Sequence, residues 1–269
     1  MQIADKVFVV TGGGNGIGRE VVLGLLARGG RVAAVDLSEA GLAETAELAA
    51  AGDRLTTHVL NITDRSAVDK LPAAVEKAHG AVDSLVNVAG IIQPFVKVVE
   101  LDIAAIEKVM NVNFWGVVYM TKAFLPKLLE RPAAALVNVS SMGALAPVPG
   151  QAAYGASKAA VKLLTEALYA ECMGTNVAVT VVFPGAIGTN IAGNSGVDMG
   201  MTKEEQAEAA KGRKTTTPED AGAAIIEGIE KGSYRVRIGG DAKMLDRLSR
   251  LAPQKATETI ANQMKDLLG

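Results

Sequence analysis

The chain has 269 residues, of which 49% are hydrophobic, and this is enough material for one buried α/β core. Its 27 Lys and Arg against 29 Asp and Glu leave a formal charge of -2, so no basic field favours a nucleic-acid partner. The single cysteine, Cys172, excludes an intrachain disulfide, fits a reducing compartment, and is expected to fill a small space in the core.

A strand-like run begins at Val7, which leaves no room for a signal peptide before it. Apolar runs such as residues 177–183 are far shorter than the roughly 18 residues of a membrane-spanning helix. These features favour a cytoplasmic protein with no membrane partner.

Short β-branched runs alternate with longer helical stretches along the chain. The predicted strands cover residues 7–11, 31–36, 55–60, 84–88, 136–140, 177–183 and 235–238. The alternation predicts a single doubly wound α/β Rossmann domain with about seven mainly parallel strands and helices on both faces. Gly52 is expected to close an alanine-rich helix, and Pro218 to begin the helix that runs near residues 220–231.

Two regions break this alternation. Residues 190–217 lack strand periodicity, include a polar stretch near 203–211 that favours a short helix, and are predicted to form a substrate lid. From residue 241 onward, apolar residues at roughly helical spacing predict a helical extension that packs on the body or on a partner subunit: Leu245, Leu248, Leu251, Ile260, Met264 and Leu267. We therefore expect a Rossmann domain over residues 1–240 and a C-terminal extension over 241–269.

A glycine-rich segment follows the first strand directly. It reads Thr11-Gly12-Gly13-Gly14-Asn15-Gly16-Ile17-Gly18, and a helix is expected from about Ile17. Glycines let the backbone approach a pyrophosphate, and the helix N-terminus presents unpaired N-H groups to it. The second strand ends in Asp36, about 20 residues further on, where a carboxylate accepts hydrogen bonds from an adenosine ribose. Together the two features predict dinucleotide binding.

Asp36 also bears on the choice of dinucleotide, because its charge repels a 2'-phosphate. The glycine-rich segment supplies no cation to hold one, so NAD(H) is favoured over NADP(H). Arg19 leaves an alternative open, because it lies just inside the helix and can reach toward the ribose; an exposed arginine there is more often only solvated.

Tyr154 and Lys158 are four residues apart in a segment of small and apolar residues, which places them on one face of a buried helix. A tyrosine that exchanges protons near neutral pH needs its pKa lowered by about 2 to 3 units. A nearby ammonium and an oxidised nicotinamide would both act in that direction.

In these motifs the chain resembles the short-chain dehydrogenase/reductase superfamily over nearly its whole length. The resemblance implies a catalytic tetrad of Asn113, Ser141, Tyr154 and Lys158. It also matches Asn87-Val88-Ala89-Gly90 after the fourth strand and Pro184-Gly185-Ala186-Ile187-Gly188-Thr189 after the sixth. The cofactor contacts so predicted are Gly12, Asn15, Gly16, Ile17, Gly18, Asp36, Leu37, Asn61, Ile62, Asn87, Ala89, Gly90, Tyr154, Lys158, Pro184, Gly185, Ile187 and Thr189.

The chain departs from the family pattern at a few positions. Asn61 stands where many relatives have an aspartate that accepts from the adenine amino group, and its amide oxygen can still accept. Val88 replaces a frequent asparagine. The C-terminal extension replaces the glycine-rich ending of many bacterial relatives. This change puts the usual family tetramer in doubt, so we expect a homo-oligomer that is either a tetramer or a dimer.

The expected reaction is the interconversion of a secondary alcohol and a ketone, with Tyr154 as acid and base. Two alternatives stay open: an epimerase or dehydratase-like enzyme that uses bound NAD, and a non-catalytic NAD-binding module. The expected substrate is a moderately hydrophobic small molecule, and its predicted contacts are Gln93, Met142, Leu145, Gln151 and Ile191. His58 and His79 are too few and too far apart in the sequence to suggest a metal site, and we expect both on the surface.

Overall fold

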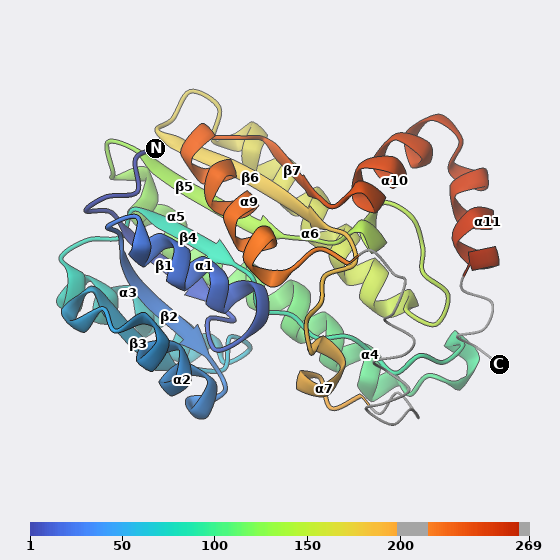
Figure 1. Ribbon diagram of the computed structural model, residues 1–269, viewed down its shortest axis with the longest axis horizontal. Helices are drawn as coiled ribbons and strands as arrows, with labels where there is room; N and C mark the ends of the chain where they lie inside the picture. The colour runs from blue at the N-terminus through green and yellow to red at the C-terminus, as the bar shows by residue number, and fades with distance from the viewer. Residues whose placement is uncertain (198–214, 264–269) are drawn as a thin grey trace.

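A computed structural model describes residues 1–197 and 215–263 of the chain. In these residues seven parallel strands form one sheet in the order β3-β2-β1-β4-β5-β6-β7 (Figure 1). The strands are β1 (Val7–Thr11), β2 (Arg31–Asp36), β3 (Leu55–Val59), β4 (Ser84–Asn87), β5 (Ala134–Val139), β6 (Val177–Pro184) and β7 (Arg235–Ile238). This confirms the predicted doubly wound sheet.

Helices cover both faces of the sheet (Figure 1). They are α1 (Gly16–Ala27), α2 (Glu39–Ala49), α3 (Arg65–His79), α4 (Ile103–Met110), α5 (Gly116–Leu129), α6 (Ala152–Glu171), α7 (Ile191–Asn194), α9 (Pro218–Lys231), α10 (Gly240–Leu251) and α11 (Pro253–Gln263). The shorter turns in the described part of the chain are η1 (Gly52–Arg54), η2 (Val98–Glu100), η3 (Asn111–Trp115) and η4 (Met142–Ala144). One core cluster lies between the sheet and α1, α2 and α9, and a second lies between the sheet and α3, α5 and α6.

Strand β1 shows why the strands are apolar along their whole length. Phe8 and Val10 belong to the cluster under α1, whereas Val7 and Val9 belong to the cluster under α3. Successive side chains of a strand point to opposite faces, so a sheet covered on both faces needs apolar residues at every position. Cys172 is buried in the second cluster, as predicted.

The predicted element ends are correct to within two residues, with one correction. Gly52 does not close α2. Ala50 takes the left-handed conformation there, with a φ of 43°, and its N-H bonds to the carbonyl of Ala46. The helix therefore ends before the chain reaches Gly52, which begins the short turn η1 instead. Pro218 begins α9, as predicted.

The sheet reverses its direction of growth at β1, which pairs with β2 on one side and with β4 on the other. Helices that leave this point diverge to opposite faces, and ligands of open α/β sheets bind in the crevice at the carboxyl ends of these strands. The fold thus places a binding crevice beside the glycine-rich segment that follows β1.

The C-terminal helices α10 and α11 extend beyond β7 and lie against the chain segment that follows β5 (Figure 1). Leu245 and Ile260 pack with Ala146 in a small third cluster. Leu251, by contrast, is 86% exposed, because α10 ends at this residue and the chain turns into α11. Met264 and Leu267 lie outside the described residues.

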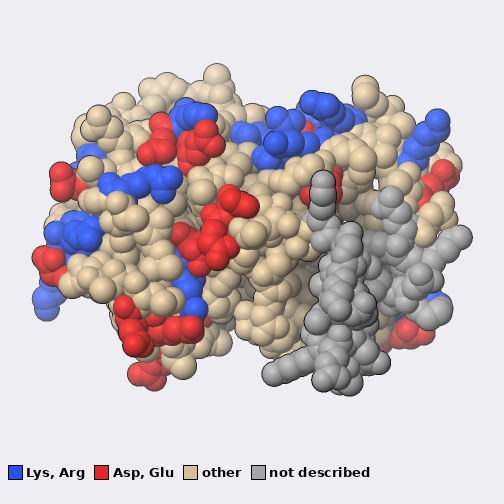
Figure 2. Space-filling view, viewed as in Figure 1, with Lys and Arg blue, Asp and Glu red and all other residues tan. Residues whose placement is uncertain are grey.

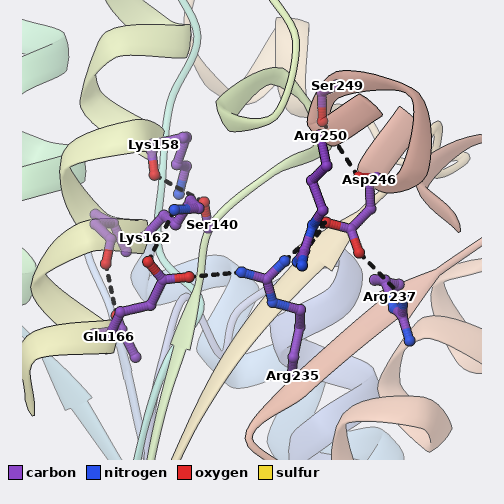
Figure 3. Close-up of polar contacts among 11 residues, drawn as sticks. Ser140, Lys158, Lys162, Glu166, Arg235, Arg237, Asp246, Ser249 and Arg250 are labelled. Carbon is purple, nitrogen blue, oxygen red and sulfur yellow. Dashed lines mark hydrogen bonds and ion pairs between the residues drawn. The ribbon is translucent and has the colours of Figure 1, made fainter. Parts of the chain in front are cut away.

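An ionic network ties α10 to β7 and α6 (Figure 3). Arg235 donates to Asp246 on α10 at 2.7 Å and to Glu166 on α6 at 2.6 Å. Arg237 and Arg250 also donate to Asp246, which is only 2% exposed. Figure 2 shows basic side chains gathered near α10 and β7, while acidic and basic residues alternate elsewhere on this face.

The lid region is described only at its two ends. Residues 191–194 form α7, and Thr216 bridges to Ile187. The short helix predicted near residues 203–211 lies outside the described residues. Within the described part of the chain, no helix is both long and apolar enough to span a membrane.

Candidate active site

A cavity of about 570 Å³ opens at the carboxyl ends of β1, β2 and β4. Its walls come from the glycine-rich segment, the ends of β2 and β3, the segment after β4, the inner side of α4 and η3, and the start of the lid. Twelve of the predicted cofactor contacts line it: Gly12, Asn15, Gly16, Ile17, Gly18, Asp36, Leu37, Asn61, Ile62, Ala89, Gly90 and Thr189. The predicted substrate contact Ile191 lines the same cavity.

The glycines of this segment are required by close contacts. Gly12 has a φ of 72°, and a Cβ there would lie 2.9 Å from the backbone nitrogen of Ala89. A Cβ on Gly18 would overlap the carbonyl oxygen of Gly12. Gly16 has a φ of 51° and faces Thr189 across the cavity. The cradle that a pyrophosphate needs is therefore present in the backbone itself.

Asp36 holds the glycine-rich segment and lines the cavity. One carboxylate oxygen accepts from the N-H of Gly14 at 2.9 Å, and the other accepts from the N-H of Ser38 at 2.9 Å. A carboxylate has about four acceptor positions, so two remain for ligand hydroxyls. This geometry fits a ribose at the end of β2.

Arg19 does not reach this cavity. Its guanidinium donates to the carbonyl of Gly14 at 2.5 Å, to the hydroxyl of Thr45 at 3.1 Å and to Glu44 at 2.6 Å. These bonds hold the charge on the far side of the segment, between α1 and α2. The alternative in which Arg19 meets the ribose is not seen in this structure.

Asn61 differs from the expectation for an adenine contact. Its side-chain oxygen already accepts from the N-H and the hydroxyl of Thr63, at 3.0 and 2.9 Å. A carbonyl oxygen has two lone pairs, and both are used here. The side-chain amide nitrogen of Asn61, a hydrogen-bond donor, is the group that remains for a ligand in the cavity. The prediction that Asn61 accepts from the adenine amino group is therefore wrong for this conformation.

Helix α6 carries both Tyr154 and Lys158. Lys158 is 3% exposed, and its ammonium donates to the carbonyl of Val139 at the end of β5, at 3.0 Å. The carbonyl of Lys158 accepts from the Ser140 hydroxyl at 2.8 Å (Figure 3). The end of β5 thus fixes α6, which we call the catalytic helix, at both the side chain and the backbone of Lys158.

Burial acts on both members of this pair. It lowers the pKa of Lys158 to about 8, so the ammonium stays protonated at neutral pH. Burial also raises the pKa of Tyr154, and a hydrogen bond with Ser141 opposes this rise without cancelling it. The lowered tyrosine pKa that the sequence led us to expect is therefore not a property of the chain alone.

Asn113 lies in η3, a single π-helical turn between α4 and α5, and is fully buried. Its side-chain oxygen accepts from the N-H of Ile91 at 2.8 Å, and its amide donates to the carbonyl of Ile91 at 2.9 Å and to Ser157 at 3.0 Å. Such turns are frequent at functional sites because they redirect side chains out of helical register. Asn113 joins the segment after β4 to the catalytic helix.

Ser141 follows β5 and is 8% exposed. Its hydroxyl accepts from the N-H of Gly143 at 3.1 Å. A Cβ on Gly143 would lie 3.5 Å from this hydroxyl and 3.7 Å from the ring of Tyr154. Gly143 therefore faces the space between the serine and the tyrosine. The structure brings together all four residues of the predicted tetrad.

Comparison with known proteins identifies the family of the chain. Residues 6–200 match the family model described as short chain dehydrogenase. The chain belongs to the short-chain dehydrogenase family. The oxidoreductase SadH of Mycobacterium tuberculosis is 40% identical over 250 residues, which cover 91% of this chain and 90% of SadH. This short-chain dehydrogenase is accordingly an oxidoreductase, and its family binds a nicotinamide cofactor.

Two solved structures of the family differ in their cofactor. A short-chain dehydrogenase/reductase from Burkholderia phymatum in complex with NAD has a TM-score of 0.84, with 26% identity and coverage of 96% of this chain and 97% of that one. A short chain dehydrogenase from Burkholderia cenocepacia in complex with NADP has a TM-score of 0.80, with 27% identity and coverage of 97% and 99%. The fold is therefore compatible with either dinucleotide.

Six predicted cofactor contacts of this short-chain dehydrogenase do not line the cavity: Asn87, Tyr154, Lys158, Pro184, Gly185 and Ile187. Asn87 is 2% exposed, and its amide donates to Asn138 at 2.9 Å. Gly185 packs directly against Asp241, whose carboxylate accepts from the N-H of Ala186 at 2.7 Å. Pro184 ends β6, and Ile187 bridges to Thr216.

The predicted substrate contacts separate into different places. Leu145 and Gln151 line a second cavity of about 220 Å³ beside the start of α6. Met142 packs against the third core cluster. Gln93 is 1% exposed, and its side chain hydrogen bonds to the backbone of α6, so the structure does not place it at a substrate surface.

Nine residues that line the cavity were not among the predicted contacts, and three of them are Lys108, Asn194 and Ser195. Lys108 brings a cation to the wall from α4. Asn194 on α7 donates to Asn15 in the glycine-rich segment at 2.9 Å, and the hydroxyl of Ser195 accepts from the N-H of Ile92 at 3.0 Å. The two contacts hold residues 194–195 against the cavity wall, and they join residues so distant in the chain that no local spacing signals them.

His58 and His79 are not simple surface residues. Both are half-buried, and each hydrogen bonds to the hydroxyl of Thr56, at 3.0 and 2.9 Å. Burial is the main cause that lowers the pKa of each histidine. In the described part of the chain, no group of three or more His, Cys, Asp or Glu side chains is arranged to hold a metal ion.

Proposed function

We propose that this short-chain dehydrogenase interconverts a secondary alcohol and a ketone with NAD(H), and that Tyr154 transfers the proton. The observation that carries the proposal is the convergence of Asn113, Ser141, Tyr154 and Lys158 behind Gly90 and Ile91. These two residues line the cavity that also contains the glycine cradle and Asp36. A dinucleotide that spans this cavity would bring its reactive ring to the tyrosine.

Each part of the candidate site has a separate role. The backbone of the glycine-rich segment holds the pyrophosphate, and Asp36 holds the adenosine ribose. When bound, the dinucleotide would supply the hydride chemistry that interconverts the alcohol and the ketone. The Ser141 hydroxyl holds the substrate oxygen, and the Oη of Tyr154 removes the alcohol proton in oxidation and donates it in reduction.

We propose that Lys158 acts on the tyrosine through its charge once the cofactor is bound, because in the chain alone burial and the Ser141 hydrogen bond are the causes that shift the pKa of Tyr154. A buried ammonium beside a phenol stabilises the phenolate, which favours proton removal. The chain alone does not bring the pKa of Tyr154 below its usual value, because burial outweighs the Ser141 hydrogen bond. We infer that the positive charge of the oxidised nicotinamide completes the shift, which links proton removal to the presence of the oxidised cofactor.

Two features support NAD(H) over NADP(H). Asp36 presents a negative charge where a 2'-phosphate would lie, and Arg19 is held away from the cavity by Gly14, Thr45 and Glu44. Apolar residues of the segment after β4 and of the lid, such as Ile91 and Ile191, support a moderately hydrophobic small-molecule substrate.

We also propose the chain organisation that the packing favours: a Rossmann domain over residues 1–240 and a helical extension over 241–269. The third core cluster and the ionic network around Asp246 join this extension to the domain. The homo-oligomer remains part of the proposal, as a tetramer or a dimer.

A substrate screen tests the proposal. The purified chain is incubated with a panel of secondary alcohols and with NAD or NADP, and formation of the reduced cofactor is followed by its absorbance. We expect net reduction of NAD with at least one hydrophobic alcohol and a lower kcat/KM with NADP. Conversion of a substrate without net cofactor reduction would contradict the proposed dehydrogenation, and so would dinucleotide binding without turnover of any alcohol or ketone.

A further inference from the structure

One short segment touches three members of the tetrad. Residues 90–93 follow shortly after the end of β4. A Cβ on Gly90 would lie 3.0 Å from the ammonium nitrogen of Lys158. Ile91 exchanges two hydrogen bonds with Asn113. Gln93 contacts the backbone of Tyr154, so the segment that leaves the cofactor cavity continues as a support of the catalytic residues.

Gln93 makes the most specific of these contacts. Its side-chain oxygen accepts from the N-H of Ala153 at 2.8 Å and from the N-H of Tyr154 at 3.1 Å, and its side-chain amide donates to the carbonyl of Gly150 at 3.0 Å. Its own carbonyl accepts from the Gln151 side chain at 2.8 Å. With 1% of its surface exposed, Gln93 is sealed between the two segments.

Helix α6 needs such a partner. The first N-H groups of any helix lack acceptors within the helix, and a side chain at the N-cap usually supplies one. The N-cap residue of α6, Gln151, makes no such bond. Gln93 supplies the acceptor instead, from 60 residues away in the chain, and its bond to Gly150 fixes the orientation of its amide.

We propose that Gln93 is a positioning residue for the oxidoreduction, in that it fixes the first turn of α6 and so sets Tyr154 against Ser141 and the cavity. The inference rests on the proposed function of Tyr154. Tyr154 is the third residue of α6, where an unsupported helix frays. A displacement of about 1 Å at a reacting group costs about 100-fold in rate. Gln93 therefore acts on kcat without touching the substrate or the cofactor.

Two substitutions at this position separate its bonds. Gln93→Leu keeps a similar size and removes all three side-chain hydrogen bonds. Gln93→Glu keeps an acceptor for Ala153 and Tyr154 and loses the donor to Gly150. We expect kcat to fall by about 10- to 100-fold in Gln93→Leu and by less in Gln93→Glu. The Kd for NAD should stay unchanged in both, because Gln93 does not line the cofactor cavity.

Thr180→Val is the matched control. Thr180 is 1% exposed on β6, and its hydroxyl donates to the carbonyl of Ser233, so the variant also loses a buried hydrogen bond, away from the cavity. We expect it to lower the Tm and to leave kcat unchanged. Amide hydrogen exchange gives a readout independent of activity: the N-H groups of Ala153 and Tyr154 should exchange faster in Gln93→Leu and not in Thr180→Val.

The outcomes distinguish this inference from the proposed function. A wild-type chain that turns over no alcohol or ketone overturns the proposed function, whereas the exchange measurement still decides whether Gln93 holds the helix. Unchanged exchange at Ala153 and Tyr154 in Gln93→Leu overturns the role of Gln93. That role is also overturned if Gln93→Leu and Thr180→Val have equal kcat, or if Gln93→Glu is no more active than Gln93→Leu.

Discussion

The two ends of the candidate site, the cavity for the nucleotide and the buried catalytic residues beside it, are built in different ways. The nucleotide end consists of backbone N-H groups, glycines and a carboxylate, and Asp36 and Asn15 face the open cavity. The catalytic end consists of polar side chains taken into the interior, with Asn113 fully buried and Lys158 only 3% exposed. The nucleotide end is shaped for a ligand at little electrostatic cost. The catalytic end keeps a charge in the interior, and the proposed chemistry depends on that charge.

Of the substitutions that compare the two ends, Lys158→Met should have the largest effect on the free energy of unfolding. Burial lowers the pKa of Lys158 from 10.5 to about 8, and a shift of this size corresponds to about 3 kcal/mol. The variant should be more stable than wild type by that order at pH 7 and should lose turnover. Unfolding in denaturant across a pH series measures both the gain and its pH dependence.

The sign of this dependence follows from the two states of the lysine. Below about pH 8 the side chain is protonated in both the folded and the unfolded chain, so the cost is fully present. Between about pH 8 and 10.5 the folded chain releases the proton first, and the wild type gains stability relative to the variant. A difference that does not change with pH, or a variant less stable at pH 7, would show that the buried charge carries no cost.

At the nucleotide end, Gly18→Ala should act through backbone contact. The new Cβ would meet the carbonyl oxygen of Gly12, and neither backbone can move without opening the cradle. We expect a loss of about 2 kcal/mol in the free energy of unfolding together with weaker NAD binding, measured by denaturation and by fluorescence titration. Gly240→Ala is the control, because a Cβ there meets nothing within 4 Å. Equal behaviour of the two variants would argue against a tight cradle.

Asp36→Ala should separate binding from chemistry. It removes a carboxylate that accepts from Gly14 and Ser38, and hydrogen bonds to a charged group are worth about 1.5 to 3 kcal/mol. We expect weaker NAD binding, a smaller preference over NADP, and an unchanged kcat at saturating cofactor. Asp69→Ala, at an exposed carboxylate on α3, serves as the control in the same steady-state assays. A large fall in kcat with an unaltered Kd for NAD would contradict the proposed role of Asp36 in cofactor binding.

The smallest effect is expected from Asn61→Asp. One oxygen of the aspartate can keep the two bonds to Thr63, and the second oxygen replaces the amide donor that Asn61 now has left over. An added acceptor for the adenine amino group is worth about 1 kcal/mol, so calorimetry should detect NAD binding a few-fold tighter. Binding that weakens would mean that the amide donor of Asn61 itself contacts the nucleotide.

The sequence predicted those parts of the molecule that depend on local spacing. The glycine cradle and Asp36 lie within one βαβ unit, and Tyr154 and Lys158 lie one turn apart on a single helix. The doubly wound parallel sheet followed from the alternation of strands and helices, and the pairing of β1 with both β2 and β4 confirms it.

The features that escaped prediction depend on how distant segments meet. Gln93 supports α6 across 60 residues, and Asn15 meets Asn194 across 179 residues. The acceptor of Asn61 is consumed by a turn whose geometry no spacing reveals. The pKa of Tyr154 depends on burial by the whole fold, so the spacing to Lys158 could indicate a pair but not the direction of its shift.

In the proposed division between the two ends, Tyr154 transfers the proton, whereas the nucleotide end only binds the cofactor. Tyr154→Phe tests this division most directly, because the ring stays and the hydroxyl is lost. We predict that kcat falls by about 100- to 10,000-fold while the Kd for NAD remains that of the wild type. A variant that binds NAD normally and turns over alcohol at a rate close to wild type would contradict the role of Tyr154.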